Sequence, residues 1–364
     1  MARNLWADIH LGAITHNYRL AKAQAPGARA CAIIKADAYG HGAVAVARHL
    51  DREVDAFGVA CIEEALELRE AGIASPVLLL EGFFEASELP AILSHHLWTA
   101  VHALHQVDAL EAFAKERGGL DGMAIWLKVD SGMHRLGLDP AALSGALQRV
   151  KALPGVGEVV VMSHFASADE PDPNPTVRQL ELMDEILALH DGAVSLSNSA
   201  AVMAWPQAHR QWLRPGVMLY GGNPFGMAQP VADQLQPAMT LSTEIIAIRE
   251  VEEGDCVGYG GTYRCQQRTR IGTLAVGYAD GYSRHTPNGT PVHLQSGYAT
   301  LAGRVSMDMV TIDLNAHANA QVGDRVELWG KNVSVNDVAR LCGTIPYTLL
   351  SGLTRRVKRR LVGG

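Results

Sequence analysis

The chain has 364 residues, 48% of them hydrophobic and 19% charged, which is the composition of an ordinary globular protein long enough for two domains. Its net charge of −7 and isoelectric point near 6.1 argue against a nucleic-acid-binding surface, which needs a basic face. The one basic cluster lies near the C-terminus and is interpreted as part of a solvated final strand (Arg355, Arg356, Lys358, Arg359 and Arg360).

The five cysteines are an odd number and form no C-x-x-C pair. This indicates free thiols in a reducing compartment rather than a disulfide framework or a zinc site. The N-terminal sequence MARNLWADIHLG has charges where a signal peptide needs an apolar run, and no apolar stretch is long enough to span a membrane. We therefore expect a cytoplasmic protein without a metal site.

Short apolar runs alternate with amphipathic helical patterns over the first two-thirds of the chain, as in the helical segments 63–72 and 177–190. Eight apolar runs are expected to be strands: 31–35, 57–61, 77–82, 97–101, 124–130, 158–165, 193–198 and 216–221. Eight strands alternating with helices over about 230 residues predict an α/β fold, a (β/α)8 TIM-like barrel. On pattern alone, an open doubly wound sheet is the alternative.

The pattern changes after about residue 226, where helical periodicity fades and strand-like runs separated by glycine-rich breaks take over. This predicts a barrel domain spanning 1–230 and a mostly β domain spanning 231–364. One late helix is expected near residues 334–341. The proline- and acid-rich segment 168–175 is expected to be an exposed connection at the mouth of the barrel.

Lys35 ends the first expected strand, in the run AIIKADAYGHG, and a loop of small residues carries Tyr39 before a helix begins near Ala43. A lysine in this place can hold a carbonyl compound as a Schiff base, because partial burial lowers its pKa and frees the amine as a nucleophile. The alternative is a lysine that extends its charge into solvent from a strand end.

Other polar residues follow expected strands, at the rim where barrels of this kind carry their chemistry. They are Lys128, Arg135, His164, Asn198 and Ser199. Arg214 precedes the eighth strand as drawn, and it reaches the same rim only if that strand begins earlier.

The loops after the last two strands of such barrels commonly bind phosphate. Ser199 offers a hydroxyl there, and Gly216 and Val217 offer backbone N–H groups, although a plain turn glycine is the alternative for Gly216. Combined with Lys35, these residues indicate a phosphorylated aldehyde cofactor, of which pyridoxal 5'-phosphate (PLP) is the common one.

The segment around Lys35 resembles the cofactor-lysine motif of bacterial alanine racemases, which are PLP-dependent enzymes of fold type III. The resemblance extends from about Leu5 to the C-terminus. It implies that Lys35 forms the Schiff base with PLP and that Arg214 donates a hydrogen bond to the pyridine nitrogen. Because an arginine keeps its proton, the ring nitrogen would stay neutral, which favours return of the proton over transamination. The implied phosphate ligands are Tyr39, Ser199, Gly216, Val217 and Tyr347.

A racemase needs acid/base groups on opposite faces of the substrate carbon. The resemblance implies Lys35 on one face and Tyr259, from the β domain of the partner subunit, on the other, and hence a homodimer with shared active sites. An unperturbed tyrosine has a pKa of ~10, poorly matched to neutral pH, so His164 and Arg214 are implied as a relay behind it. The implied substrate contacts are Arg135, also placed beside the phenolic oxygen of PLP, and Met307, Asp308 and Tyr278.

Lys128 has a further implied role. In many relatives the matching lysine is carbamylated by CO2, and the new negative charge positions the arginine matching Arg135, seven residues later. An ordinary lysine paired with Asp130 or another carboxylate is the alternative.

Three other functions are alternatives to an alanine racemase. A decarboxylase with the same two domains is disfavoured, because no run of glycines follows the strand near Ser195 and no C-terminal cysteine motif is present. A non-catalytic PLP carrier would not need the domain that contains Tyr259, and a racemase for larger amino acids often has an export signal. We expect an enzyme that interconverts L- and D-alanine, for peptidoglycan synthesis or for alanine catabolism, without nucleic-acid or membrane partners.

Overall fold

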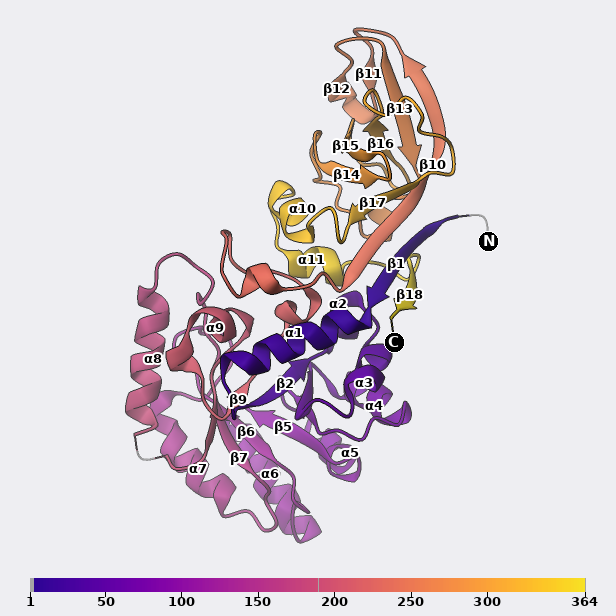
Figure 1. Ribbon diagram of the computed structural model, residues 1–364. Coiled ribbons are helices and arrows are strands. Elements are labelled where there is room, and N and C mark those ends of the chain that lie inside the picture. The colour runs from indigo at the N-terminus through magenta and orange to yellow at the C-terminus, as the bar shows by residue number, and fades with distance from the viewer. Residues whose placement is uncertain (1–2, 189, 364) are drawn as a thin grey trace.

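The computed structural model has two lobes (Figure 1), and it describes residues 3–188 and 190–363. In the larger lobe, eight parallel strands pair in the order β8-β7-β6-β5-β4-β3-β2-β9 and curl into a nearly closed barrel. The edges meet where Ser195 Oγ donates to the carbonyl of Trp212 at 2.9 Å. The predicted barrel is confirmed. The strands are β2 (Arg29–Ile33), β3 (Ala56–Val59), β4 (Val77–Leu79), β5 (Leu97–Val101), β6 (Ile125–Lys128), β7 (Val159–Met162), β8 (Ala193–Ser195) and β9 (Trp212–Leu213).

Helices follow the barrel strands and cover the outside of the barrel (Figure 1). Four of these strands are buried along their whole length and the other four at all but one residue, which is why they are continuous apolar runs in the sequence. The helices of this lobe are α1 (Leu11–Gln24), α2 (Lys35–Gly40), α3 (Ala43–Leu50), α4 (Ile62–Glu70), α5 (Leu89–Ser94), α6 (Leu104–Arg117), α7 (Leu143–Lys151), α8 (Asn174–Ile186) and α9 (Ser199–Ala204).

Three tryptophans fill the inside of the barrel. The ring of Trp126 lies 6.4 Å from that of Trp98 and 5.3 Å from that of Trp212, measured between centroids. Since β9 neighbours neither β5 nor β6 in the sheet, the contact between Trp126 and Trp212 crosses the barrel. The interior is therefore a packed core, and space for a ligand is left at the strand ends.

The prediction of an eighth strand at 216–221 is wrong. The strand is β9, and Val217–Tyr220 form the 3-10 helix η4. All four residues of η4 are buried, so the short run is apolar on every side and shows no period that could separate a strand from a helix. Because the strand comes earlier, Arg214 lies just beyond its C-terminal end, on the same rim as the other candidate residues.

The smaller lobe is a second eight-stranded sheet, in the order β13-β16-β15-β14-β17-β10-β1-β18, in which β13 also pairs with β10. Both chain ends join it: β1 (Leu5–His10) pairs antiparallel with β10 and parallel with β18 (Lys358–Val362). The late helix expected near 334–341 is confirmed as α10 (Val335–Leu341). The other elements are β10 (Met239–Val251), β11 (Cys256–Val257), β12 (Tyr263–Arg264), β13 (Thr269–Leu274), β14 (Pro291–Leu294), β15 (Gly297–Leu301), β16 (Val310–Asp313), β17 (Arg325–Trp329) and α11 (Pro346–Ser351).

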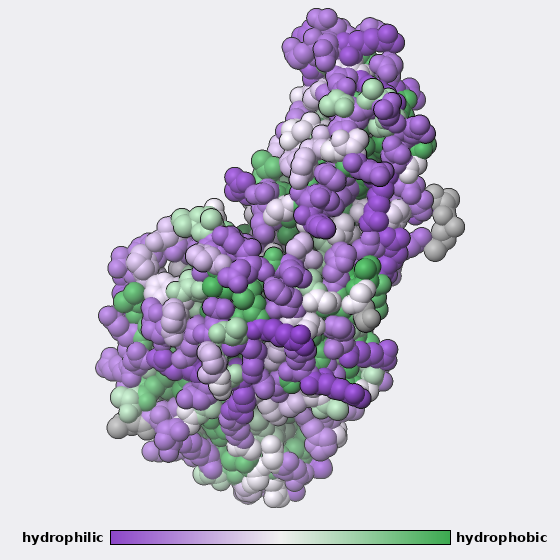
Figure 2. All heavy atoms as spheres, in the orientation of Figure 1, coloured by the Kyte–Doolittle hydropathy of each residue, from purple (hydrophilic) through white to green (hydrophobic). Residues whose placement is uncertain are grey.

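Polar residues cover most of the face shown in Figure 2, with apolar residues scattered between them. Among the residues that the structure describes, no helix has both the length and the apolar character that a membrane crossing requires.

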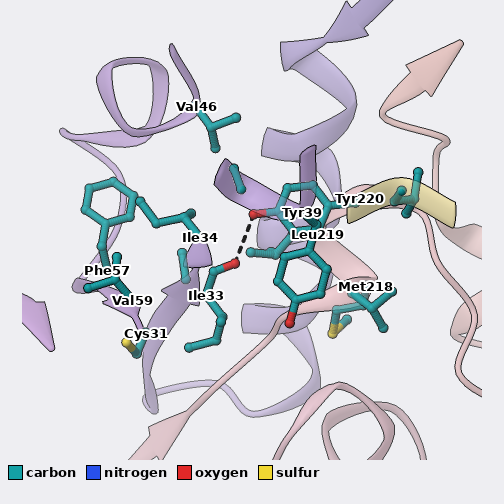
Figure 3. Close-up of a cluster of buried hydrophobic side chains, with 14 of the residues drawn as sticks. Cys31, Ile33, Ile34, Tyr39, Val46, Phe57, Val59, Met218, Leu219 and Tyr220 are labelled. Atoms are coloured by element: carbon teal, nitrogen blue, oxygen red, sulfur yellow. Dashed lines mark hydrogen bonds between the residues drawn. The ribbon is translucent and has the colours of Figure 1, made fainter. Parts of the chain in front are cut away.

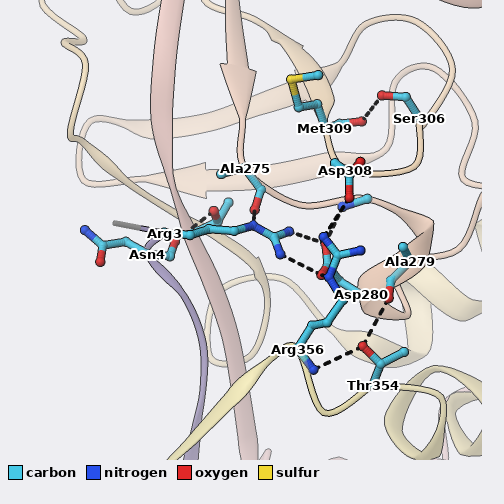
Figure 4. A network of polar contacts seen from close by, with 12 residues as sticks. Arg3, Asn4, Ala275, Ala279, Asp280, Ser306, Asp308, Met309, Thr354 and Arg356 are labelled. Atoms are coloured by element: carbon cyan, nitrogen blue, oxygen red, sulfur yellow. Dashed lines mark hydrogen bonds and ion pairs between the residues drawn. The ribbon is translucent and has the colours of Figure 1, made fainter. Parts of the chain in front are cut away.

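One buried carboxylate ties both ends of the chain to the smaller lobe (Figure 4). Asp280 is fully buried; it accepts a hydrogen bond from Arg3 Nη1 at 2.9 Å and lies 3.1 Å from Arg356 Nε. Arg356 also pairs with Asp308 at 2.6 Å. Part of the basic C-terminal cluster is thus used in internal ion pairs.

Removing this carboxylate should destabilise the fold. Asp280→Ala leaves Arg3 and Arg356 without their buried partner and is expected to lower the free energy of unfolding by about 2 kcal/mol, measured by urea denaturation. Asp337→Ala removes an exposed aspartate–arginine pair within α10 and is the matched control, with little expected change. Equal effects of the two substitutions would contradict the role of Asp280.

Candidate active site

A pocket of about 260 Å³ opens at the C-terminal ends of the barrel strands. A wider cleft of about 770 Å³ in the smaller lobe contains none of the candidate residues. The smaller pocket is therefore the candidate active site. Ten candidate residues line it: Lys35, Tyr39, Lys128, Arg135, His164, Ser199, Arg214, Gly216, Val217 and Tyr347.

Lys35 begins the segment that follows β2, and its side chain is 37% exposed, so its amine reaches the pocket. The amine lies 3.8 Å from the carboxylate of Glu81. Glu81 is not among the residues expected at the site from the sequence, although it follows the apolar run of β4 and its position at a strand end could have identified it. Asn198 also lines the pocket, and the other lining residues are the apolar Ile33, Leu80, Leu136 and Met162.

The segment labelled α2 is not a right-handed helix, because its backbone turns left-handed directly after Lys35. The four residues from Ala36 to Tyr39 have φ of 52–53° and ψ of 40–53°, and none of them is glycine. This conformation costs roughly 1–2 kcal/mol per residue, because Cβ approaches the carbonyl oxygen that follows it. Such a turn persists only where the surrounding structure holds it, and it determines where Lys35 and Tyr39 lie.

Tyr39, at the end of this turn, packs into an aromatic wall (Figure 3). Its ring stacks on Tyr220 with centroids 4.9 Å apart, and the ring of Tyr347 from α11 lies 5.9 Å away. The Tyr220 hydroxyl donates to the carbonyl of Ile33 at 2.9 Å, which ties the wall to the end of β2. Burial raises the pKa of Tyr39, so its phenol stays protonated and can donate a hydrogen bond at neutral pH.

Gly216 leaves room beside this wall. A Cβ at this position would lie only 2.8 Å from the hydroxyl oxygen of Tyr39. The amides of Gly216 and Met218 donate to Ser199 Oγ at 2.8 and 3.4 Å. Ser199 therefore already accepts two hydrogen bonds, and its own hydroxyl proton remains to donate to a ligand.

Arg214 is buried, and its guanidinium is fixed by acceptors from two neighbouring strand ends. It donates to the carbonyls of Ser195 and Ser163 at 2.8 and 2.6 Å, and to Nδ1 of His164 at 3.4 Å. Burial lowers the pKa of Arg214 to about 10, so it remains protonated at neutral pH. Burial, followed by the charge of Arg214, holds the pKa of His164 well below its usual range, so this histidine is a neutral acceptor.

Lys128 is buried, and the positively charged side chains of Arg214 and Arg135 lie near it. Burial, followed by the charges of Arg214 and Arg135, lowers the pKa of Lys128 to about 8. Asp130 does not pair with it; the Asp130 carboxylate instead lies 3.0 Å from Nδ1 of His134 and accepts a bond from the His134 amide. A substantial fraction of the Lys128 amine is therefore neutral just above neutral pH.

The other four candidate residues, Tyr259, Tyr278, Met307 and Asp308, do not line the pocket. They gather on the smaller lobe along the loop 303–309: a Cβ on Gly258 would lie 3.4 Å from the amide of Arg304, and the amide of Tyr278 donates to Ser306 at 3.1 Å. Strands β11 and β12, which flank Tyr259, lie at the end of this lobe away from the barrel (Figure 1). Within one chain, the two groups of residues are separate.

The low pKa of Lys128 predicts a pH-dependent stability. Between its folded pKa of about 8 and the ordinary value of 10.5, the unfolded chain binds more protons, so stability contributed by this side chain rises with pH. Relative to Lys128→Met, the wild-type protein should gain about 2 kcal/mol of unfolding free energy between about pH 7.5 and pH 10. Urea denaturation in CO2-free buffer measures this difference, and a difference independent of pH would contradict it.

Both lobes match models of the same protein family. The family model described as the alanine racemase N-terminal domain matches residues 9–224, and the one described as the alanine racemase C-terminal domain matches residues 238–361. A catabolic alanine racemase of Pseudomonas aeruginosa is 51% identical over 349 residues, which are 96% of this chain and 96% of that protein. An alanine racemase of Pseudomonas taetrolens is 51% identical over 98% of each chain.

Solved structures agree with these relatives. The crystal structure of a biosynthetic alanine racemase from Pseudomonas aeruginosa has a TM-score of 0.93 and 48% identity, and the match covers 99% of this chain and 100% of that one. An alanine racemase from Acinetobacter baumannii gives a TM-score of 0.93 at 35% identity with the same coverage. The barrel, the antiparallel second lobe and the sequence all match, and the chain belongs to the alanine racemase family.

Proposed function

We propose that the chain interconverts L-alanine and D-alanine with PLP bound in the barrel pocket, using Lys35 and Tyr259 of the partner subunit as the two acid/base groups. One observation carries this proposal. The strand-end amine of Lys35, the buried guanidinium of Arg214 and the small polar phosphate site proposed around Ser199 and Gly216 all line one pocket. Membership of the alanine racemase family supports the reaction.

The residues of the pocket fit PLP. The Lys35 amine would hold the aldehyde carbon, and Arg214 would donate to the ring nitrogen. The gap left by Gly216 beside Tyr39 and the free hydroxyl proton of Ser199 suit a phosphate group, together with Val217 and Tyr347. When bound, PLP spreads the negative charge that develops on the substrate carbon as its proton leaves.

The protein residues move the proton. Lys35 Nζ would take or return it on one face of the carbon, and the hydroxyl of Tyr259 from the partner subunit would do so on the other. Arg214 stays protonated, because its pKa of about 10 lies above neutral pH, so it donates a hydrogen bond without giving up a proton. This favours return of the proton to alanine, and neutral His164 holds Arg214 as part of the relay behind Tyr259.

A second subunit would complete the site. Tyr259 and Met307 are 67% and 53% exposed in a single chain, so both side chains are free to contact a second subunit. In a homodimer they would reach the partner's pocket together with Tyr278 and Asp308, while Arg135 binds the substrate carboxylate from within the pocket. We further propose a cytoplasmic enzyme with domains 1–230 and 231–364, of which the first contributes strand β1 to the sheet of the second lobe.

We propose that Lys128 is carbamylated. Near its pKa of about 8, the neutral amine can attack CO2 and release a proton, and the resulting carbamate anion would offset the charges of Arg135 and Arg214. Carbon-13 NMR with labelled bicarbonate tests this. A carbamate resonance that is absent in Lys128→Met supports the modification, and a wild-type spectrum without it rules it out.

Circular dichroism of an L-alanine solution with purified protein and PLP tests the reaction. Decay of the signal to zero, abolished by Lys35→Ala, is the expected result. A stable signal despite bound PLP would reject alanine as the substrate. The assay leaves two roles open, supply of D-alanine for the cell wall and alanine catabolism, since relatives of both kinds match at 48–51% identity.

Tyr259→Phe should affect the two directions unequally. Loss of the hydroxyl should slow exchange of the α-proton of L-alanine by about 100-fold and that of D-alanine far less, because Lys35 serves the other face. NMR of α-deuterium incorporation from D2O measures both exchange rates. Equal losses would contradict the assignment of the two faces.

Gly216→Ala should weaken cofactor binding. The added methyl group would lie 2.8 Å from the Tyr39 hydroxyl and displace it from the proposed phosphate site. The dissociation constant of PLP should therefore rise about tenfold. Gly145→Ala on α7 is the matched control, because no heavy atom lies within 4 Å of the added Cβ. Equilibrium dialysis measures both values, and an unchanged affinity in Gly216→Ala would argue against a phosphate at this position.

A further inference from the structure

The left-handed turn from Ala36 to Tyr39 directly follows Lys35 and ends on Tyr39, and both of these residues line the pocket. Four consecutive non-glycine residues in this conformation are under strain, and a relaxed turn would move one or both side chains away from the pocket. The contacts that hold the turn therefore control the geometry of the site.

The downstream end of the turn is held by buried contacts. The His41 ring is fully buried, and its Nδ1 lies 3.0 and 2.9 Å from the carbonyl oxygens of Ala38 and Tyr39. Arg359 from β18 donates to the carbonyl of Gly40 at 3.1 Å. Gly40 is pressed so closely against α11 that a Cβ there would lie 2.3 Å from the carbonyl oxygen of Leu350.

The upstream end is held by a carboxylate from α4. Glu64 Oε1 accepts a hydrogen bond from the amide of Ala36 at 2.7 Å, and its Oε2 accepts one from the amide of Ala60 at 2.8 Å. Ala60 follows β3, so Glu64 links the first residue of the turn to the neighbouring strand of the barrel. Hydrogen bonds to an ionised carboxylate are stronger than those between neutral groups.

We propose that Glu64 is a positioning residue, whose carboxylate holds the left-handed turn and thereby places Lys35 and Tyr39 in the pocket. Glu64 does not line the pocket and acts through the amide of Ala36. The proposal rests on the proposed function only in assuming that Lys35 and Tyr39 hold PLP. The geometry of the turn itself can be tested without the cofactor.

Glu64→Gln tests the proposal in the full-length protein. Glutamine keeps the shape but turns an NH2 group toward one of the two amide donors, so one hydrogen bond is lost and two donors face each other. Amide hydrogen exchange in the segment 35–42 should become about tenfold faster, and the PLP dissociation constant should rise about tenfold. Glu70→Gln, an exposed position on the same helix, is the matched control and should change neither value.

A rescue experiment separates positioning from a general loss of stability. Ala36 is exposed, and glycine adopts its φ of 53° without strain, so Ala36→Gly should restore much of the PLP affinity when added to Glu64→Gln. A substitution that merely weakened α4 would not be rescued at Ala36. The double variant is compared with Glu64→Gln by equilibrium dialysis and by hydrogen exchange.

The outcomes distinguish a failure of the positioning role of Glu64 from a failure of the proposed function. Unchanged exchange in Glu64→Gln, or no rescue by Ala36→Gly, would overturn the positioning role. A wild-type protein that binds no PLP would instead overturn the proposed function, while the exchange data would still test the contact between Glu64 and the turn.

Discussion

Convergence of the barrel strands at their carboxyl ends is the constraint on which the site depends. Lys35, Lys128 and Arg214 come from strand ends that are far apart in the sequence, yet closure of the barrel puts them around one pocket of about 260 Å³. Glu81 is the carboxylate among the lining residues of the described chain. A pocket with this excess of positive charge suits a ligand that carries a phosphate and a carboxylate. Burial, followed by this charge, lowers the pKa values of Lys128 and His164.

The second lobe supports the pocket of its own chain and also carries a second group of candidate residues. Within one chain, α11 supplies Tyr347 and packs against Gly40, and Arg359 of β18 binds the same segment, so the end of the chain supports the turn that carries Tyr39. The loop 303–309 on the same lobe gathers a second group of candidate residues that this chain's own pocket does not use. Under the proposed function, a single chain would thus provide an acid/base group for only one face of the substrate carbon.

Much of this arrangement follows from the sequence. Alternation of strands and helices predicted the barrel, and polar residues at strand ends predicted most of the pocket, including Lys35 and His164. The run 216–221 was misassigned because a short segment that is buried on every side has no diagnostic period. The left-handed turn could not be predicted, since its residues are ordinary alanine, aspartate and tyrosine and the surrounding tertiary contacts impose the conformation. The group that includes Tyr259 was identified through family resemblance, because no local pattern links it to the barrel.

The central claim is that each active site combines Lys35 of one subunit with Tyr259 of the other. Mixing unfolded Lys35→Ala and Tyr259→Phe subunits in equal amounts and refolding them tests it directly. About half of the dimers would be hybrids, each with one site that carries both wild-type residues, so the mixture should recover about a quarter of the wild-type racemase activity. A mixture no more active than the two parent variants would contradict the claim.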